Sequence, residues 1–295
     1  MKKIYVTGIC GLLGSAIVRE LAGKYELCGV DIVDVDIPNC TVEKFDLLDK
    51  ELLTDSIKAY HPDVVIHTAA AINVDKCETE RESTYKLNVE VTENIAHICE
   101  EIDCKMIYVS TDAVYDGEKD GLYVEDDVVN PVNYYGQTKL DGECEVRKLK
   151  NGLVLRTNIY GVNIQNKKSF GEWIVSSLRD NKELNMFTDI KFSPILVNEL
   201  AQIMDKCICN DIVGMYHACG TGSISKYDFG MLVKEIFDIK TGKIHKSTSD
   251  TMNFTARRSK NMGMSNAKLS EILNIHISTP KESIEKFKEL YLKEN

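Results

Sequence analysis

The segment NYYGQTKLDGE, residues 133–143, carries two neighbouring tyrosines followed by a lysine. On a helix, residues i and i+4 share a face, whereas residues i and i+5 do not. A helix here would therefore pair Tyr135 with Lys139 and leave Tyr134 out. A phenol has a pKa of about 10 and a nearby cation lowers it, so Tyr135 could donate a proton near neutral pH. The alternative is an ordinary amphipathic helix with a packed Tyr and an exposed Lys.

A second candidate site is the glycine-rich stretch TGICGLLGS, which contains Gly8, Gly11 and Gly14. It lies between an apolar strand pattern and a helix pattern. Glycines permit a tight turn and the close approach of a ligand. The following helix N-terminus offers free N–H groups and partial positive charge to a pyrophosphate. The pattern predicts a dinucleotide site, although such turns also occur without ligands.

An acidic residue supports this interpretation. Asp31 ends the second strand pattern, about 20 residues after the glycines, where a ribose-binding carboxylate is expected. A carboxylate accepts a hydrogen bond from the 2′-hydroxyl and repels a 2′-phosphate, and no Arg or Lys follows closely. NAD(H) is therefore favoured, with NADP(H) left open. A helix cap or turn residue is the alternative role for Asp31.

The elements that must position these residues alternate along the first half of the chain. Short, continuously apolar strand patterns are followed by helical patterns, which predicts a parallel sheet covered on both faces. Right-handed crossovers make it an α/β doubly wound, Rossmann-like sheet. Strands are expected over 2–8, 25–31, 62–71, 105–111 and 152–161, and helices over 12–21, 52–61, 85–102 and around Tyr135.

The second half is less regular. Helices are expected over 169–181, 198–209, 225–237 and 280–295, with a short strand over 214–220. We therefore divide the chain into a dinucleotide-binding domain, 1–160, and a mainly substrate-binding domain, 161–295. Segments 198–202 and 214–220 are candidates to pack back onto the first domain.

Composition limits the function classes. The 295 residues are 43% hydrophobic and 28% charged, which is ordinary for a globular protein, and the net charge of −10 disfavours nonspecific nucleic-acid binding. No apolar run is long enough to cross a membrane, and the N-terminus does not resemble a signal peptide. Ten cysteines without a C-x-x-C pair indicate buried thiols in a reducing cytoplasm and no zinc site. No metal is predicted.

Further motifs carry a family resemblance. TGICGLLG, FDLLD (45–49), VIHTAAA (65–71), YVSTDAVYDG (108–117) and YGQTK occur in the order seen in extended short-chain dehydrogenases/reductases. Within that branch, STDAVYDG, YYGQTKLDGE, LRTNIYG and HTAAAINVDKCE most resemble the dTDP-4-dehydrorhamnose reductases. The resemblance covers the whole chain, and its specificity lies in the combination of motifs.

The resemblance implies a set of site residues. Thr111, Tyr135 and Lys139 match the catalytic trio: Tyr135 exchanges a proton with the ketone oxygen, Lys139 lowers its pKa and holds the nicotinamide ribose, and Thr111 bonds the same oxygen. The predicted cofactor residues are Gly8, Cys10, Gly11, Leu12, Leu13, Gly14, Asp31, Asp46, Leu47, Ala69, Ala70, Ala71, Asn88, Tyr135 and Lys139. The predicted substrate residues are Thr111, Asp112, Asn158, Trp173 and Arg257.

Three details qualify these assignments. Asn88 matches the structural asparagine of the superfamily, but a polar residue on a helix is also common. Arg257 and its neighbour Arg258 could grip a diphosphate or form a solvated pair. His217 is expected to pack at a strand end and not to act in catalysis.

Departures from the family pattern also bear on the activity and the substrate. Related dehydratases carry Asp then Glu after the catalytic Thr, whereas Ala113 follows Asp112 here. The missing Glu argues against elimination of water. The reductases usually have Arg-Pro where this chain has Arg257 and Arg258, which leaves the sugar and the nucleotide open. Residues 187–201, with Pro194, match the reductases' substrate loop.

The sequence thus predicts a reductase of the 4-keto group of a nucleotide-linked deoxysugar, dependent on NAD(P)H. Two alternatives stay open: a nucleotide-sugar epimerase that keeps its NAD bound, and a non-catalytic regulatory subunit of the same fold. The expected partner is the nucleotide sugar, with no nucleic acid and no membrane, and a homodimer is left open.

Overall fold

One parallel sheet organises the molecule. The computed structural model describes residues 1–33, 35–165 and 167–294. Seven strands lie in the order β11-β6-β5-β4-β1-β2-β3, and every pairing between them is parallel. The strands are β1 (Lys3–Thr7), β2 (Glu26–Asp31), β3 (Thr41–Lys44), β4 (Val64–His67), β5 (Lys105–Thr111), β6 (Gly152–Thr157) and β11 (Gly214–His217). The doubly wound sheet predicted from the alternating patterns is confirmed.

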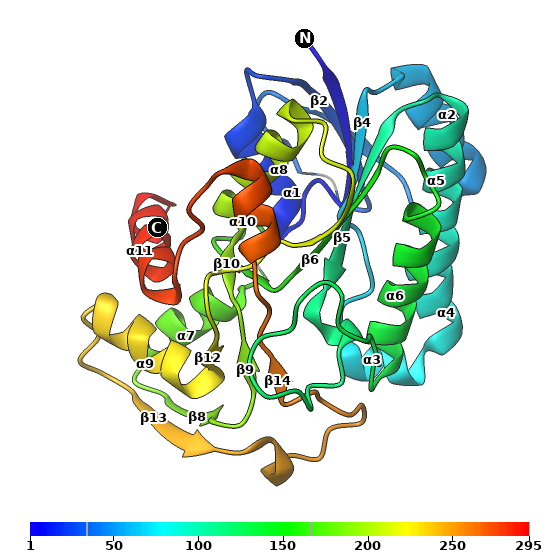
Figure 1. The fold of residues 1–295 in the computed structure, drawn as a ribbon. Coiled ribbons are helices and arrows are strands. Elements are labelled where there is room, and N and C mark those ends of the chain that lie inside the picture. The colour runs from blue at the N-terminus through cyan, green and yellow to red at the C-terminus, as the bar shows by residue number, and fades with distance from the viewer. Residues whose placement is uncertain (34, 166, 295) are drawn as a thin grey trace.

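Helices cover both faces of this sheet (Figure 1). Helix α1 (Leu12–Leu21) lies against one face beside α8 (Val197–Cys209), and their apolar side chains share a core with β1. The other face is covered by α2 (Lys50–Tyr60), α5 (Val91–Glu101) and α6 (Tyr134–Val146). Burial on both faces explains why the strands read as continuous apolar runs.

The long helix expected over 85–102 has a more complex structure. It begins as α4 (Arg81–Tyr85), passes through a π-helical turn η1 (Lys86–Glu90) and continues as α5. A short helix, α3 (Val74–Thr79), precedes it. Such π turns often occur at functional sites, and this one carries Asn88.

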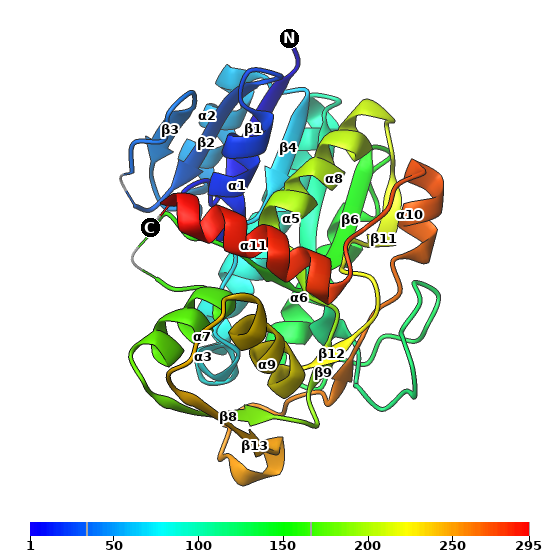
Figure 2. The same ribbon diagram turned by 90° about the vertical axis from the view of Figure 1, so that its left-hand side faces the viewer.

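A smaller part of the molecule lies beyond the carboxyl ends of the strands (Figure 2). Its core joins Tyr160, Phe229 and Phe287, whose rings meet at centroid distances of 5.1 and 5.5 Å. Its elements are β7 (Ile159–Tyr160), α7 (Phe170–Arg179), β8 (Glu183–Phe187), β9 (Lys191–Phe192), β10 (Ile195–Leu196), β12 (Ile224–Ser225), α9 (Lys226–Ile236), β13 (Lys243–Ser247) and β14 (Asn261–Met262). Short 3-10 turns η2 (Asp112–Val114) and η3 (Ser249–Thr251) and the helices α10 (Ala267–Leu273) and α11 (Pro280–Glu294) complete the chain.

The second half of the chain serves both parts. Strand β11 extends the main sheet beside β6, and α8 packs on α1, so two segments beyond residue 160 pack with the predicted dinucleotide-binding domain. The predicted helix over 280–295 is α11, whose last predicted residue, Asn295, lies outside the described residues. The division near residue 160 stays an interpretation.

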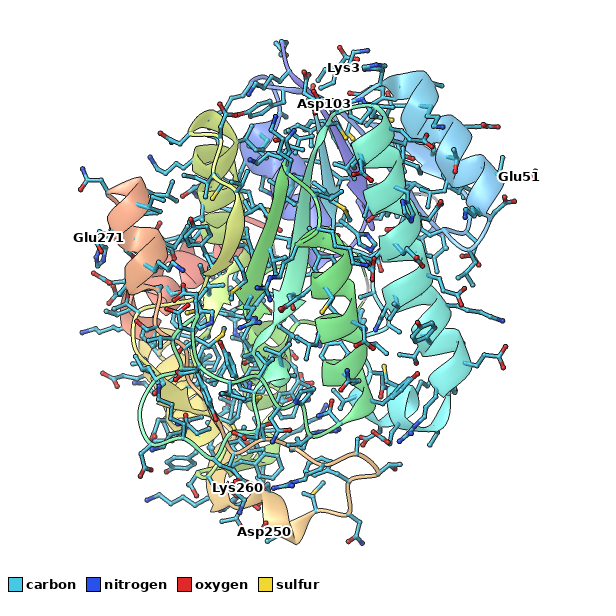
Figure 3. The ribbon with its side chains drawn as sticks, turned by 45° about the vertical axis from the view of Figure 1, so that its right-hand side comes forward. Lys3, Glu51, Asp103, Asp250, Lys260 and Glu271 are labelled. Carbon is cyan, nitrogen blue, oxygen red and sulfur yellow. The ribbon has the colours of Figure 1, made fainter. Side chains whose placement is uncertain are left out.

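Two general features bear on function. Within the described residues, no helix is both long enough and apolar enough to cross a membrane. None of the ten cysteines, all of which lie in the described residues, forms a disulfide, and eight of them are at least partly buried. Figure 3 shows Lys3 and Asp103 at one end of the molecule and Lys260 and Asp250 at the other, where the smaller part lies.

Candidate active site

The site residues gather at the carboxyl edge of the sheet. Strand β1 pairs with β2 on one side and with β4 on the other, so the direction of chain progression reverses at β1. In open α/β sheets, ligands bind in the crevice outside the carboxyl ends at such a switch point. The glycine turn follows β1, the alanine run follows β4, and Asp112 follows β5.

The glycine turn between β1 and α1 cannot take side chains. Gly8 has φ +70°, and a Cβ added there would lie 3.0 Å from the backbone of Ala69. A Cβ at Gly14 would lie 2.3 Å from the Gly8 carbonyl oxygen. Gly11 is the N-cap of α1 and provides no side-chain cap, so the helix N-terminus keeps backbone donors for an anion. Small side chains are also needed in the predicted alanine run, because Ala69 packs against this turn.

Asp31 has a structural role as well as the predicted ligand role. Its carboxylate accepts from the backbone N–H of Cys10 at 3.0 Å and from those of Ile32 and Val33 at 2.8 and 3.2 Å. The acid thus ties the glycine turn to the end of β2. Gln165, which sequence reasoning missed, donates from Nε2 to the Cys10 carbonyl at 2.7 Å. The turn is therefore held from two sides.

The remaining predicted cofactor residues border the same edge. Leu12 and Ala70 are half-buried, and Leu13 and Leu47 are buried. Asp46 is exposed after β3, and its carboxylate accepts from the Leu48 N–H at 3.0 Å.

Asn88 lies behind the site. Its side chain is buried, accepts from Ala71 N–H at 2.8 Å, and donates to the Ala71 carbonyl at 3.1 Å and to Thr138 Oγ1 at 3.1 Å. These contacts use both amide hydrogens. Asn88 therefore ties the alanine run to helix α6, as expected for the structural asparagine of the resemblance.

Helix α6 presents Tyr135 toward Thr111. Asn133 caps the helix by accepting from Gly136 N–H at 2.9 Å. Burial raises the pKa of the Tyr135 hydroxyl above its usual value; the Thr111 hydroxyl opposes that rise, and the Asp112 charge adds to it. Both Tyr135 and Lys139 lie within α6, so the helix that the i, i+4 argument requires is present.

The side chain of Lys139 lies against an aromatic ring of the sheet. Its Nζ lies 4.0 Å from the centroid of the Tyr108 ring on β5, and burial lowers the pKa of Lys139 to about 7. The interactions that set the Tyr135 pKa are burial, Thr111, Asp112 and Cys77. Lys139 is not among these groups, and its Nζ lies against the Tyr108 ring. The expected effect of Lys139 on the Tyr135 pKa stays a prediction.

Tyr134 has different neighbours. Its backbone N–H donates to Glu78 Oε2 at 3.0 Å, and its ring lies under the Arg81 guanidinium at 4.8 Å. Glu78 also pairs with Arg81. The two adjacent tyrosines therefore face different surroundings: Tyr135 faces Thr111, and Tyr134 packs on α3 and α4.

Thr111 and Asp112 form a buried hydrogen-bonded unit after β5. The Thr111 hydroxyl donates to Asp112 Oδ1 at 3.1 Å and accepts from Ala113 N–H at 3.1 Å. Asn158 donates from Nδ2 to Asp112 Oδ2 at 2.5 Å. Asp112 is 3% exposed, and burial raises its pKa. Three of the predicted substrate residues are thus in one network.

The other two predicted substrate residues lie on separate elements. Trp173 on α7 is 40% exposed and stacks on Phe170 with centroids 6.0 Å apart. Arg257 is exposed and pairs with Glu118 at 3.1 Å, and its carbonyl accepts from Asn133 Nδ2 at 3.0 Å. The backbone of Arg257 therefore lies at the start of α6.

Arg258 pairs with Asp75 of the motif HTAAAINVDKCE. Arg258 donates to Asp75 Oδ2 at 2.7 Å, and the Ala256 N–H donates to Asp75 Oδ1 at 3.0 Å. These hydrogen bonds and the Arg258 charge hold the pKa of Asp75 below its usual value. Together with the Glu78 contact to Tyr134, helix α3 thus fixes both the C-terminal loop and the start of the catalytic helix. The sequence signal was the motif itself, but its partners are 181 and 183 residues away.

His217 packs at a strand end, as predicted. It is fully buried, its Nε2 lies 2.8 Å from the Tyr115 hydroxyl, and burial lowers its pKa to about 4. Among the residues that the structure describes, no cluster of His, Cys, Asp or Glu is arranged to hold a metal ion.

Comparisons with known proteins match this geometry. The family model described as "RmlD substrate binding domain" matches residues 1–292. A dTDP-4-dehydrorhamnose reductase from Aggregatibacter actinomycetemcomitans is 30% identical over 246 residues, 79% of this chain and 78% of the relative. The methionine adenosyltransferase 2 subunit beta from Xenopus laevis is 30% identical over 268 residues, 87% of this chain and 78% of the relative. The crystal structure of a hypothetical dTDP-4-dehydrorhamnose reductase from Sulfolobus tokodaii has a TM-score of 0.85 and 31% identity, and covers 94% of this chain and 97% of that one.

Proposed function

The chain belongs to the RmlD substrate binding domain family, within the extended short-chain dehydrogenase/reductase superfamily, and from this premise we propose that it reduces the 4-keto group of a nucleotide-linked deoxysugar. The observation that carries the proposal is the meeting of Tyr135 with Thr111 at the carboxyl edge of the sheet. That edge is also the one where the glycine turn packs against the alanine run.

Each site residue has its own role in the proposed reduction. A bound nicotinamide cofactor supplies hydride to the carbonyl carbon. Tyr135 gives its proton to the carbonyl oxygen as negative charge develops there, and Thr111 holds the Tyr135 hydroxyl in place. Lys139 lies about one helical turn from Tyr135 and is 3% exposed, and this burial lowers its pKa to about 7. A polar ribose hydroxyl would be a favourable partner for its amine.

The cofactor is a proposal of its own. The glycine turn and the N-terminus of α1 fit a pyrophosphate, and Asp31 suits a ribose with a free 2′-hydroxyl. We favour NADH over NADPH on the charge of Asp31. Tighter binding of NADPH by the wild-type protein would contradict this choice.

Substrate binding is assigned to Asp112, Asn158, Trp173 and Arg257. The half-exposed Trp173 ring offers an apolar face to a sugar or base. Arg257 can exchange its exposed pair with Glu118 for a diphosphate at little cost, because exposed ion pairs contribute about 0–1 kcal/mol. Ala113 stands where dehydratases carry Glu, so water elimination lacks its second proton-transfer group.

A panel of 4-keto sugar nucleotides tests the proposal directly. NADH and NADPH absorbance is followed with the wild-type protein and with Tyr135→Phe as the matched control. Turnover of added NADH that depends on Tyr135 supports a reductase, whereas interconversion of sugars without net NADH use supports an epimerase.

A second candidate function has one specific observation in its favour. A relative of similar identity is a subunit of methionine adenosyltransferase 2. Cofactor binding without turnover of any sugar nucleotide would favour such a regulatory role. We also propose that the protein acts in the cytoplasm, where its ten cysteines, none of them in a disulfide, stay reduced. We propose that it forms a homodimer, which sedimentation would test.

A further inference from the structure

One hydrogen bond joins the smaller part of the molecule directly to the glycine turn. The segment between β7 and α7 runs over residues 161–169, of which the structure describes 161–165 and 167–169. Gln165 in this segment donates from Nε2 to the Cys10 carbonyl at 2.7 Å, across 155 positions of the chain. Because β7 and α7 both pack into the core of the smaller part, Gln165 reaches the turn from the predicted substrate-binding domain.

The segment holds Gln165 in place through an asparagine and a helix cap. The Asn163 side chain accepts from the Gln165 N–H at 3.1 Å and donates to the Lys167 carbonyl at 2.7 Å, which forms a local turn. The Asn163 N–H donates to Glu172 Oε1 at 3.3 Å. The other carboxylate oxygen of Glu172 accepts from the Ser169 N–H at 2.8 Å, within the capping box of α7. The position of the Gln165 backbone therefore follows that of α7.

The partner of Gln165 is one peptide unit of the glycine turn. Cys10 contributes the carbonyl of this unit, and Gly11 contributes its N–H, which donates to the Gly8 carbonyl at 3.0 Å. The N–H of Cys10 itself donates to Asp31 Oδ2 at 3.0 Å. Cys10 is fully buried, and a buried carbonyl needs a donor. The plane of the Cys10–Gly11 peptide is therefore held at both of its polar atoms.

This peptide comes directly before the backbone donors of the proposed cofactor site. Helix α1 begins at Leu12, the residue after Gly11, and no side chain caps its N-terminus. A pyrophosphate is bound there by N–H groups that point in one direction, and a carbonyl that turned in among them would repel it. The bond to Gln165 therefore fixes the direction of the Cys10 carbonyl and of the donors that follow it.

We propose that Gln165 is a positioning residue for the dinucleotide: it fixes the Cys10–Gly11 peptide of the pyrophosphate turn and couples that turn to the smaller part, so that the cofactor is retained while the bond is made. The inference deepens the proposed function and rests on it. Because a reductase exchanges its cofactor at every turnover, we assign the breaking of this hydrogen bond to the step in which the cofactor leaves.

Cofactor binding tests this role without any sugar substrate. Gln165→Ala removes the donor to Cys10, and Gln165→Glu places an acceptor and a negative charge there. Gln202→Ala is the matched control, because Gln202 donates at 2.8 Å to Glu20, a side chain on the same helix α1. Loss of one such hydrogen bond corresponds to a rise of about threefold to tenfold in a dissociation constant. We expect this rise for NADH in Gln165→Ala, mainly through faster dissociation, a larger rise in Gln165→Glu and none in Gln202→Ala.

The second measurement reports on the peptide itself in the protein without cofactor. The chain contains three Cys-Gly pairs, at residues 10–11, 28–29 and 219–220, so carbon-13 at cysteine carbonyls and nitrogen-15 at glycines give three carbonyl–amide correlations by NMR. The signal lost in Cys10→Ser assigns the correlation of the turn. Gln165→Ala should shift the 10–11 correlation and leave the other two in place as internal references, whereas Gln202→Ala should shift none.

The outcomes separate this inference from the proposed function. An unmoved 10–11 correlation in folded Gln165→Ala, or in Gln165→Glu if the alanine variant does not fold, overturns the inference. NADH dissociation that is as slow in the Gln165 variants as in the wild type also overturns it. A wild type that binds NADH but reduces no sugar nucleotide counts against the proposed reduction alone, and one that binds neither NADH nor NADPH overturns both.

Discussion

The adjacent tyrosines allow a stringent test, because one substitution can be made at two neighbouring positions. Tyr135→Phe removes the hydroxyl that meets Thr111 and leaves the ring in place. Loss of a general acid typically costs about 10² to 10⁴ in rate. At about 1.36 kcal/mol per tenfold change, the barrier to hydride transfer should rise by about 2.7 to 5.4 kcal/mol.

Tyr134→Phe should be much milder for a structural reason. The ring that lies under Arg81 and the backbone N–H that donates to Glu78 are both retained. The loss of a hydroxyl away from the proton-transfer path should change the barrier by about 0.5 kcal/mol or less, roughly a factor of two.

The assay is single-turnover oxidation of bound NADH by a 4-keto sugar nucleotide, with cofactor affinity measured by fluorescence and folding checked by circular dichroism. Tyr135→Phe should bind NADH with wild-type affinity but transfer hydride slowly. Equal losses in the two variants, or a fully active Tyr135→Phe, would refute the assignment of the proton donor.

Three further predictions concern stability, loop position and cofactor choice. Glu143 is fully buried and accepts from the Arg156 guanidinium at 2.9 and 2.7 Å, so Arg156→Met leaves it without a counter-charge. The free energy of unfolding, measured with urea, should fall by about 3 to 5 kcal/mol. A fall below about 1 kcal/mol would contradict the pairing. Asp75→Asn weakens the contact with Arg258 that holds the C-terminal loop, so KM for the sugar nucleotide should rise more than kcat falls, as steady-state kinetics would show. Asp31→Ala should narrow the difference in affinity between NADH and NADPH, measured by titration, and an unchanged ratio would count against a role for this carboxylate in ribose selection.

The regular part of the fold could be predicted because local patterns determine it. Helix α1 occupies the predicted residues 12–21, and β5 the predicted 105–111. Continuous burial of β6 on both faces produces the apolar run that identified it. The glycine turn was predictable for the same reason, since the steric requirement at Gly8 and Gly14 acts on neighbouring residues.

The parts that escaped prediction depend on contacts distant in sequence. The pairing of β8 with β13 joins segments about 60 residues apart, and neither has the pattern of a buried strand. Lys226 reads in the sequence as an ordinary lysine at the start of a helix, and only the folded chain places its ammonium over the Phe192 ring. The orientation of Lys139 is a further example, because spacing predicts which helix face it shares but not that the Tyr108 ring receives its ammonium.

Two carboxylates that follow strands of the sheet, and two cations from the second half of the chain, show how both halves contribute charged groups to the site. Asp75 follows β4 of the sheet and binds Arg258, while Asp112 follows β5 and interacts with Lys226. In both cases the sheet supplies a carboxylate and the second half supplies the cation. The ion pair of Asp75 with Arg258 joins the two parts, so we expect a substrate that binds beside it to compete with it or rearrange it. Substrate affinity should therefore depend on how firmly the smaller part is held, and mutations at either cation should affect binding without touching the cofactor turn.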